Sequence, residues 1–170
     1  MEIRDAAFEP PNKNAVVKPY VLSHGTLECY SLKKSRRFYE EFLGLEVVRH
    51  AKPSMMMRCG MKWHIVCVEV GDTLRPCGML NHWGIEVRSK EEVDKAYADA
   101  VRLKDEYGIR DIHKPANQRG VYAFYMEDLD HNWWEISYSE DFRHDDFFDF
   151  GDRFSMDEPG ETDPLPKPNA

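Results

Sequence analysis

Two stretches of the chain, residues 22–29 and 80–87, share one pattern of apolar and polar positions. The pattern predicts a strand in each, and each strand carries a histidine near its start, His24 in the first and His82 in the second. A stretch with apolar residues at helical spacing follows both strands. The chain is therefore predicted to contain an internal duplication of one structural unit, not a long array of repeats.

The two predicted helices have recognisable ends. The first spans residues 31–43, where the apolar side chains favour one helical face, and Gly44 suits the left-handed position that ends a helix. The second begins at a capping box, in which Ser89 is followed three residues later by Glu92. Gly108 ends the second helix in the same way as Gly44 ends the first.

Three strands are predicted to follow each helix. They span residues 45–50, 54–59 and 63–70 in the first half, and 109–113, 121–127 and 133–138 in the second. Each half is thus a βαβββ module with a sheet face that it cannot bury alone. We expect an α+β fold in which two paired modules form a curled mixed sheet around a cleft, and this cleft is where the candidate ligands would face.

The length of 170 residues and the apolar fraction of 42% predict a single domain with a substantial core. We expect an N-terminal extension over residues 1–19 and a domain over 20–138, divided into modules 20–76 and 77–138. Residues 139–170 form a predicted C-terminal extension that is acidic and aromatic and has a flexible end. Its segment 142–154 is too apolar for a free tail, so we expect it to pack on the domain or on a partner subunit.

Charge and composition narrow the function classes. The net charge is −8, and residues 1–138 are close to neutral, with 20 Lys or Arg against 21 Asp or Glu. No stripe of basic residues is present, which argues against a nucleic-acid partner. No apolar run approaches the roughly 20 residues of a membrane span, and the N-terminus lacks a signal-peptide core. We therefore expect a cytoplasmic protein, and the four cysteines, which form no CxxC pair, should be reduced thiols.

Candidate metal ligands come from three of the predicted strands. His24 and His82 occupy duplicated positions, and Glu135 lies in the aromatic strand 133–138, where burial of an unpaired carboxylate would be costly. Two histidines and one carboxylate are a known ligand set for non-haem iron. This set leaves coordination positions open for a substrate and dioxygen.

With these features, residues 20–138 resemble the vicinal oxygen chelate superfamily, which includes glyoxalases, bleomycin-resistance proteins and dioxygenases. Within it, the chain is most similar to the type I extradiol ring-cleaving dioxygenases. That branch places its metal histidines at the start of the first strand of each module and its glutamate in the last strand of the second. The resemblance implies Fe(II), with Mn(II) also compatible, bound by His24, His82 and Glu135, and a catechol-type aromatic substrate that reacts with O2.

The same resemblance implies further site residues. These dioxygenases carry an acid/base histidine at the start of the last strand of the first module, which is His64 here. They also carry a tyrosine ten residues before the glutamate that bonds to a substrate hydroxyl, which is Tyr125. His113 would join the substrate site if a longer loop brings it in, and Trp83 would line the pocket.

Other members of the superfamily provide the alternatives. Glyoxalases have a second glutamate in the last strand of the first module, and the sequence alignment places Cys67 there, which favours three protein ligands. A lyase or isomerase of the glyoxalase or epimerase type, with another metal and no dioxygen, stays open. So does a metal-free small-molecule-binding resistance protein on the same fold. In each case we expect a small-molecule ligand and a homo-oligomer.

Overall fold

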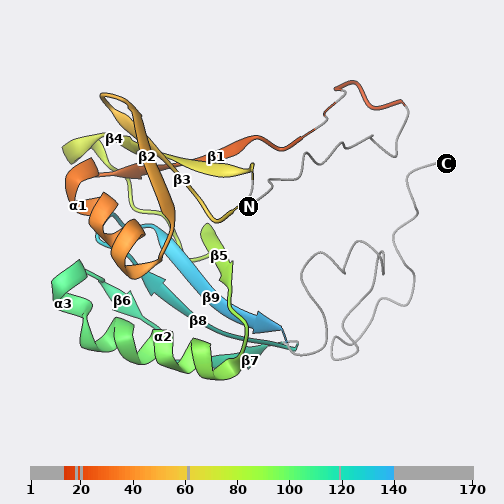
Figure 1. Cartoon of the computed structure of the whole chain (residues 1–170), viewed down its shortest axis with the longest axis vertical. Helices are drawn as coiled ribbons and strands as arrows, with labels where there is room; N and C mark the ends of the chain where they lie inside the picture. Colours follow the sequence, from red (N-terminus) through yellow and green to blue (C-terminus); the bar gives the residue numbers. More distant parts are fainter. Residues whose placement is uncertain (1–13, 18, 20, 61, 119, 140–170) are drawn as a thin grey trace.

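Each half of the chain folds into a module of the predicted kind, and Figure 1 shows the first module above the second. The computed structural model describes residues 14–17, 19, 21–60, 62–118 and 120–139. The first module contains β1 (His24–Cys29), α1 (Leu32–Arg37), η1 (Phe38–Phe42), β2 (Glu46–Ala51), β3 (Ser54–Arg58), β4 (His64–Glu69) and η2 (Gly71–Thr73). The second contains β5 (His82–Glu86), α2 (Lys90–Arg102), α3 (Lys104–Tyr107), β6 (Asp111–Ile112), β7 (Ala116–Gln118), β8 (Val121–Glu127) and β9 (Trp133–Ser139).

The strands form two mixed sheets, which confirms the predicted α+β class. The first sheet has the order β1-β4-β3-β2, and the second has the order β5-β9-β8-β6, with β7 also paired to β8. In both sheets the first and last strands of the module are parallel neighbours, while the other pairs are antiparallel. The residue that begins the first strand of each module therefore lies beside the start of the last strand.

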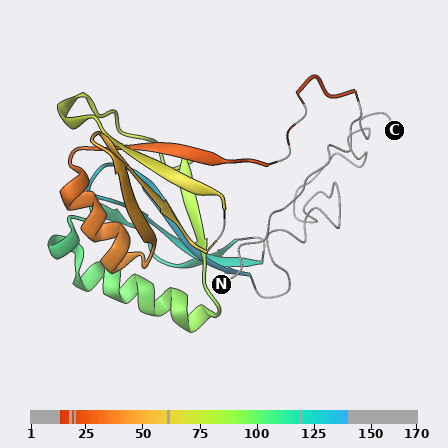
Figure 2. The same ribbon diagram turned by 45° about the horizontal axis from the view of Figure 1, so that its top comes forward.

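The helices cover one face of each sheet, and the opposite face of each sheet is left free for a site. Helix α1 packs on β4, and α2 packs on β8 and β9 (Figure 2). Strand alternation sends every second side chain under the helices. In β9 these are Trp134 and Ile136, and in β4 they are Ile65 and Cys67. All four belong to one hydrophobic cluster that spans both modules, so the two modules share a core.

The helix ends agree with the sequence, but the body of the first helix does not. Gly44 and Gly108 both have a φ of 70°, the left-handed conformation predicted for them. The Ser89 hydroxyl accepts a hydrogen bond from the Glu92 amide, as a capping box requires. The single helix predicted over 31–43 instead widens after Arg37 into a π-helical turn. A π-turn alters side-chain spacing locally, and here Phe38 stacks on Phe42 with ring centroids 5.3 Å apart.

Strand β7 is an addition to the predicted module. Its three residues, Ala116, Asn117 and Gln118, are all exposed, and so short a segment carries no alternation of apolar and polar positions from which a strand could be inferred. Pairing of its backbone with β8 creates the strand. The C-terminal segment 142–154, which we expected to pack on the domain or a partner, lies outside the described residues.

The turn between β8 and β9 joins the two modules through buried polar contacts. Asp128 accepts hydrogen bonds from the Tyr39 hydroxyl at 3.1 Å and from the Trp134 indole at 2.9 Å. Asp130 accepts from the Tyr30 amide at 2.8 Å and from the Ser35 hydroxyl. Burial and the neighbouring Asp130 raise the pKa of Asp128 to about 6, against the donors that stabilise its charge. The second module is therefore anchored in the first by carboxylates.

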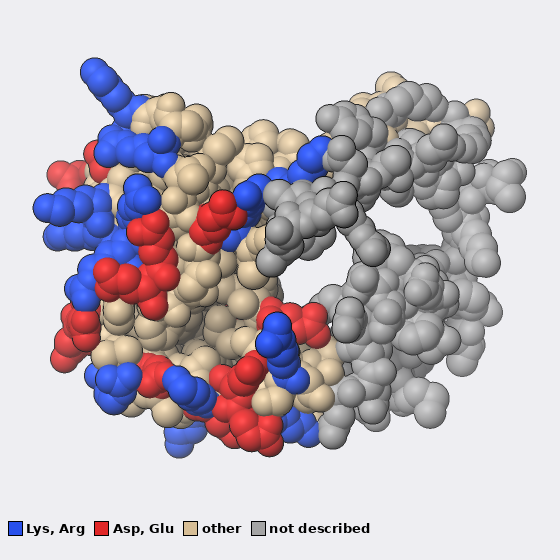
Figure 3. Space-filling view, viewed as in Figure 1, with Lys and Arg blue, Asp and Glu red and all other residues tan. Residues whose placement is uncertain are grey.

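The surface of the described part of the chain carries both signs of charge. Figure 3 shows basic and acidic side chains interspersed over one face, with no basic stripe on that face. None of the helices in the described ranges is both long enough and apolar enough to cross a membrane.

Candidate metal centre

One face of the second sheet carries a row of polar side chains that begins with Glu135. Because Trp134 and Ile136 point into the core, Glu135 projects from the other face of β9. Its cross-strand neighbours are Tyr125 on β8 and Gly84 on β5. The strand geometry alone thus brings Tyr125 beside Glu135, although the two are ten residues apart in sequence.

The two oxygens of Glu135 have different partners. The Tyr125 hydroxyl donates a hydrogen bond to Oε1 at 2.9 Å. Oε2 lies 3.4 Å from Nε2 of His82, whose ring packs edge-on against Tyr125 with centroids 5.1 Å apart. Burial and the hydrogen bond to Glu135 raise the pKa of Tyr125 to about 12, so the phenol remains a donor at neutral pH.

A backbone carbonyl orients the His82 ring. Nδ1 lies 2.9 Å from the carbonyl oxygen of Met79, which favours a proton on Nδ1 and leaves the lone pair on Nε2. Metal-binding histidines commonly have such a partner on the second nitrogen. Nε2 of His82 and Oε2 of Glu135 lie next to each other, 3.4 Å apart. The chemistry of this pair suits a divalent cation.

His113 joins the same face by strand pairing and not through the longer loop that the sequence suggested. Its amide donates to the Tyr125 carbonyl at 2.8 Å, directly after β6. Its ring packs against Trp133 with centroids 5.3 Å apart, and 44% of its side chain is exposed. Trp133 precedes Glu135 by two residues and so shares its face. Strand alternation in the sequence could therefore have identified Trp133 as a site residue.

The first module holds a second group, formed by His24 and His64. These residues face each other in the parallel pairing of β1 and β4, and their rings stack with centroids 5.6 Å apart. Nδ1 of His24 lies 2.8 Å from the Ser23 hydroxyl, and Nδ1 of His64 lies 3.1 Å from the Lys62 carbonyl. The pairing of the first and last strands thus places His64 beside His24, as its predicted role requires.

The predicted site residues therefore lie in two groups, one on each module. Among the described residues, no three or more His, Cys, Asp or Glu side chains are gathered closely enough to hold a metal ion. His24 is thus not brought into one cluster with His82 and Glu135. The ligand types fit a 2-His-1-carboxylate site, and two of its three members converge.

The strands that carry His24 and His82 nevertheless touch one residue beyond each histidine. The Trp83 ring lies against Gly25 so closely that a β-carbon there would stand 2.4 Å from its Cη2 atom. The same ring packs on Trp63 with centroids 5.7 Å apart. Trp83 also lines a cleft of about 510 Å³ between the modules, together with His82 and Glu28. Gly25 is the position that permits this close approach.

The strand register corrects one alignment made from the sequence. Thr26 of β1 pairs with Val66, and the equivalent Gly84 of β5 pairs with Glu135. Val66 and not Cys67 therefore occupies the position that matches Glu135. Cys67 points into the core, where hydrogen bonding with Cys29 and burial raise the pKa of its thiol. The pairing of each last strand with the first strand of its module, which the sequence alignment did not use, fixes this register.

Comparisons with known proteins agree with the fold. The sequence profile of the Glyoxalase/Bleomycin resistance protein/Dioxygenase superfamily matches residues 22–136. A comparison with curated protein sequences finds no match.

Solved structures share the fold. Lactoylglutathione lyase from Agrobacterium tumefaciens is similar with a TM-score of 0.53 and 19% identity, over 71% of this chain and 94% of that one. The fosfomycin resistance protein FosX from Listeria monocytogenes is similar with a TM-score of 0.55 and 22% identity, over 71% and 93%. A glyoxalase/bleomycin resistance protein/dioxygenase from Alicyclobacillus acidocaldarius has a TM-score of 0.52 and 23% identity, over 69% and 90%.

Proposed function

The chain belongs to the glyoxalase/bleomycin resistance protein/dioxygenase superfamily, and on that premise we propose that it is a non-haem Fe(II)-dependent extradiol dioxygenase. Its substrate would be a catechol-type aromatic ring, cleaved with O2. Mn(II) is the second candidate metal, because the same nitrogen and oxygen ligands suit both ions. One of the solved relatives in fold, FosX, has been crystallised with Mn(II).

The observation that carries the proposal is the position of Glu135 between Tyr125, which donates a hydrogen bond to it, and His82, which contacts its second oxygen. Tyr125 occupies Oε1 of Glu135, so Oε2 is the oxygen left to meet a metal together with Nε2 of His82. The carbonyl contact on Nδ1 of His82 supports the same orientation. Because one oxygen of Glu135 already accepts a hydrogen bond from Tyr125, this carboxylate is better suited to bind a metal through one oxygen than through both.

His24 is the proposed third ligand. The contact of Trp83 with Gly25 holds β1 against β5 one residue beyond each of the two histidines. His24 also presents its Nε2, since Nδ1 lies beside the Ser23 hydroxyl. A metal bound by His82 and Glu135 would draw the His24 side chain towards it, and this requires movement of a side chain that is exposed at the start of its strand.

The valine at the equivalent position of the first module favours three protein ligands over four. A glyoxalase-type site takes a glutamate from the last strand of each module, and Val66 cannot coordinate a metal. The second candidate, a glyoxalase- or epimerase-like lyase or isomerase, therefore lacks one of its expected ligands. The three-ligand site keeps more positions open, as a reaction of substrate with dioxygen requires.

When bound, the metal would supply coordination of the two vicinal substrate oxygens and of dioxygen. The residues of the chain would handle protons and position. Tyr125 and His113 lie on the same face as Glu135 and would hold a substrate hydroxyl between them. His64, stacked on His24, would act as the acid/base group beside the dioxygen position. Trp133, on the same face as Glu135, provides aromatic surface on which a flat ring can pack, whereas Trp83 points to the opposite face and packs on Gly25 and Trp63.

The experiment that tests the proposal is purification without oxygen, followed by metal analysis and by oxygen-uptake assays with a panel of catechols. We expect about one iron per chain, oxygen uptake with at least one catechol, and a yellow ring-fission product. Metal binding without oxygen uptake would favour the lyase or isomerase. A protein that binds neither Fe(II) nor Mn(II) after reconstitution would be a metal-free binding protein. His82→Ala serves as the control for metal-independent oxygen uptake.

A further inference from the structure

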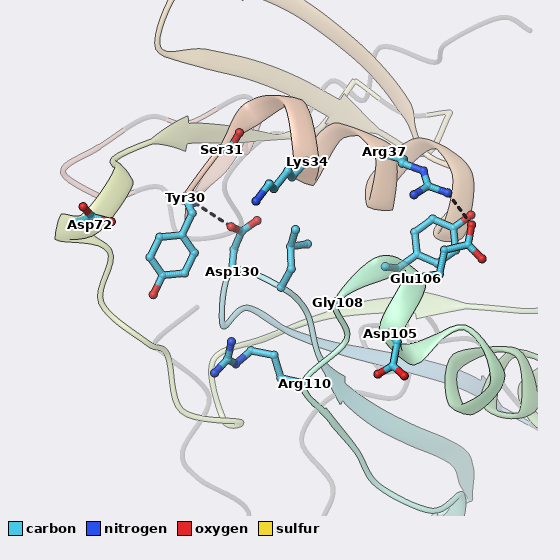
Figure 4. A pocket seen from close by; sticks show the side chains of 12 residues that line it. Tyr30, Ser31, Lys34, Arg37, Asp72, Asp105, Glu106, Gly108, Arg110 and Asp130 are labelled. Carbon is cyan, nitrogen blue, oxygen red and sulfur yellow. Dashed lines mark hydrogen bonds and ion pairs between the residues drawn. The ribbon is translucent and has the colours of Figure 1, made fainter.

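A second cavity, of about 730 Å³, lies where the two modules meet (Figure 4). Tyr30 and Lys34 of the first module and Arg110 and Asp130 of the second are among its lining residues. None of the proposed metal ligands lines it. Tyr30 follows the last residue of β1, whereas His24 begins that strand, which separates the two by about 20 Å at ~3.3 Å per residue. The cavity is therefore distinct from the metal centre.

Two cations that line this cavity have no close ion-pair partner among the described residues. Figure 4 shows Lys34 extending from α1 into the pocket, and none of the residues drawn there forms an ion pair with it. The Arg110 guanidinium reaches only a distant contact of 3.9 Å with Glu127, whose other oxygen lies 2.7 Å from His131. Both side chains extend towards the Tyr30 side of the cavity in this view.

Most of the other charged side chains that line the cavity either have partners of their own or lie at its ends. Arg37 pairs with Glu106 and Glu41 and lies over a tyrosine ring, so it contributes little free positive charge. Asp130 is buried and accepts hydrogen bonds from Ser35 and from the Tyr30 amide, and burial raises its pKa. Asp72 and Asp105 stand at opposite ends of the cavity in Figure 4. Lys34 and Arg110, which both extend towards Tyr30, are thus the cations left to act on a ligand in this cavity.

We propose that this cavity binds a small molecule with a phosphate or carboxylate group, held between Lys34 and Arg110 with Tyr30 beside it. The volume falls in the range of small-molecule sites, and two cations on separate elements suit one anionic group. Because Lys34 belongs to the first module and Arg110 to the second, the ligand would bridge the modules. Its binding should therefore raise the resistance of the whole domain to unfolding.

The test is titration of the full-length protein with sodium phosphate and, separately, with sodium citrate. Sodium chloride of equal ionic strength serves as the reference, because surface charge effects respond to salt alone. Binding is followed by calorimetry, and the melting temperature is measured in parallel. We expect a saturable response to at least one anion. Saturation by phosphate and not by citrate assigns the phosphate class, and the reverse assigns the carboxylate class.

Three variants make the test specific. Lys34→Gln and Arg110→Gln should each weaken anion binding about ten-fold or more, because each removes a charge-assisted contact. Lys33→Gln, an exposed neighbour on the same helix, should bind as the wild type does. Circular dichroism checks that each variant is folded, and the exposure of both side chains makes unfolding by one change unexpected.

The outcomes separate this proposal from the proposed function. No saturable response to either anion overturns it, and so does equal binding by Lys34→Gln and the wild type. Metal content should be the same in all three variants, since no proposed metal ligand is changed. A protein without metal can therefore still confirm the anion site, and an iron enzyme can still lack it.

Discussion

The two modules share a backbone plan but differ in what stands beside each histidine. In the first module His24 pairs with His64 across the parallel strands, and in the second His82 pairs with Trp133. Two residues further on, the same comparison sets Val66 against Glu135. The duplication thus repeats the strand positions of the histidines and not their partners, so the first module presents two histidines side by side and the second presents a histidine and a carboxylate.

The turns before the last strands differ as well. In the second module, Asp128 and Asp130 carry charge into the interface and are met by donors from both modules. In the first module, Trp63 follows the equivalent turn, and its buried indole nitrogen has no hydrogen-bond partner in the described residues. The junction is therefore polar at one turn and aromatic at the other. A single substitution can test the role of each of these differences between the modules.

The largest expected effect is loss of metal from variants of the proposed ligands. His82→Ala and Glu135→Gln each remove half of the convergent pair, and His24→Ala removes the ligand from the first module. We expect each to lower metal affinity beyond the 10–100-fold that is typical of outer partners. Metal content after dialysis measures this, with the exposed His50→Ala as a matched control. Full metal content in His24→Ala would confine the site to the second module.

The next effect concerns the histidine pair of the first module. His64→Phe keeps an aromatic ring against His24 but removes the proton-exchanging group. We expect unchanged metal content and turnover of a catechol reduced by about 10²–10⁴-fold, the usual contribution of a positioned acid or base. Normal turnover would reduce His64 to a residue that lines the pocket.

A third prediction tests the acidic turn through pH. The folded pKa of Asp128 is about 6, above the ordinary value of about 4, so the folded protein binds the proton more tightly than the unfolded chain. This group therefore adds stability as the pH falls from about 6 towards 4, by up to about 3 kcal/mol. Asp128→Asn removes that dependence. Its deficit in unfolding free energy should be larger at pH 4.5 than at pH 7.5, and an equal deficit would contradict the assignment.

A smaller effect is expected at the aromatic part of the junction. Gly25→Ala places a β-carbon 2.4 Å from Cη2 of Trp83, so the ring must move, at a cost of about 1–3 kcal/mol. Gly84→Ala is the matched control, because its β-carbon would lie 3.8 Å from Glu135, an ordinary contact distance. Urea unfolding of both variants measures the difference. Equal stability of the two variants would show that the contact of Trp83 with Gly25 does not contribute to the stability of the fold.

The smallest effect is expected at Cys67. Cys67→Ser places a hydroxyl in the core beside Cys29, and we expect a loss of about 1–2 kcal/mol in stability because the hydroxyl is buried. Metal content should not change, since Cys67 points away from the face that carries His24. Loss of metal comparable to that in His82→Ala would instead make Cys67 a ligand.

The sequence by itself determined the duplication, the α+β class and the residue types of the candidate site. Alternation in strands and helical spacing are local properties, so the elements and the two glycine helix ends at Gly44 and Gly108 follow from them. The spacing of Tyr125 and Glu135 also sufficed, because the short turn between two antiparallel strands leaves few possible registers.

Tertiary structure alone decided which residues meet across strands that are distant in sequence. The register that puts Val66 in place of Cys67, the approach of His113 through β6 and the Met79 carbonyl behind His82 depend on backbone pairing, which no residue type specifies. The anchoring of Asp128 in the first module likewise depends on how two complete modules pack. A local pattern sets the face of a strand, whereas only the packed fold sets the neighbour on that face.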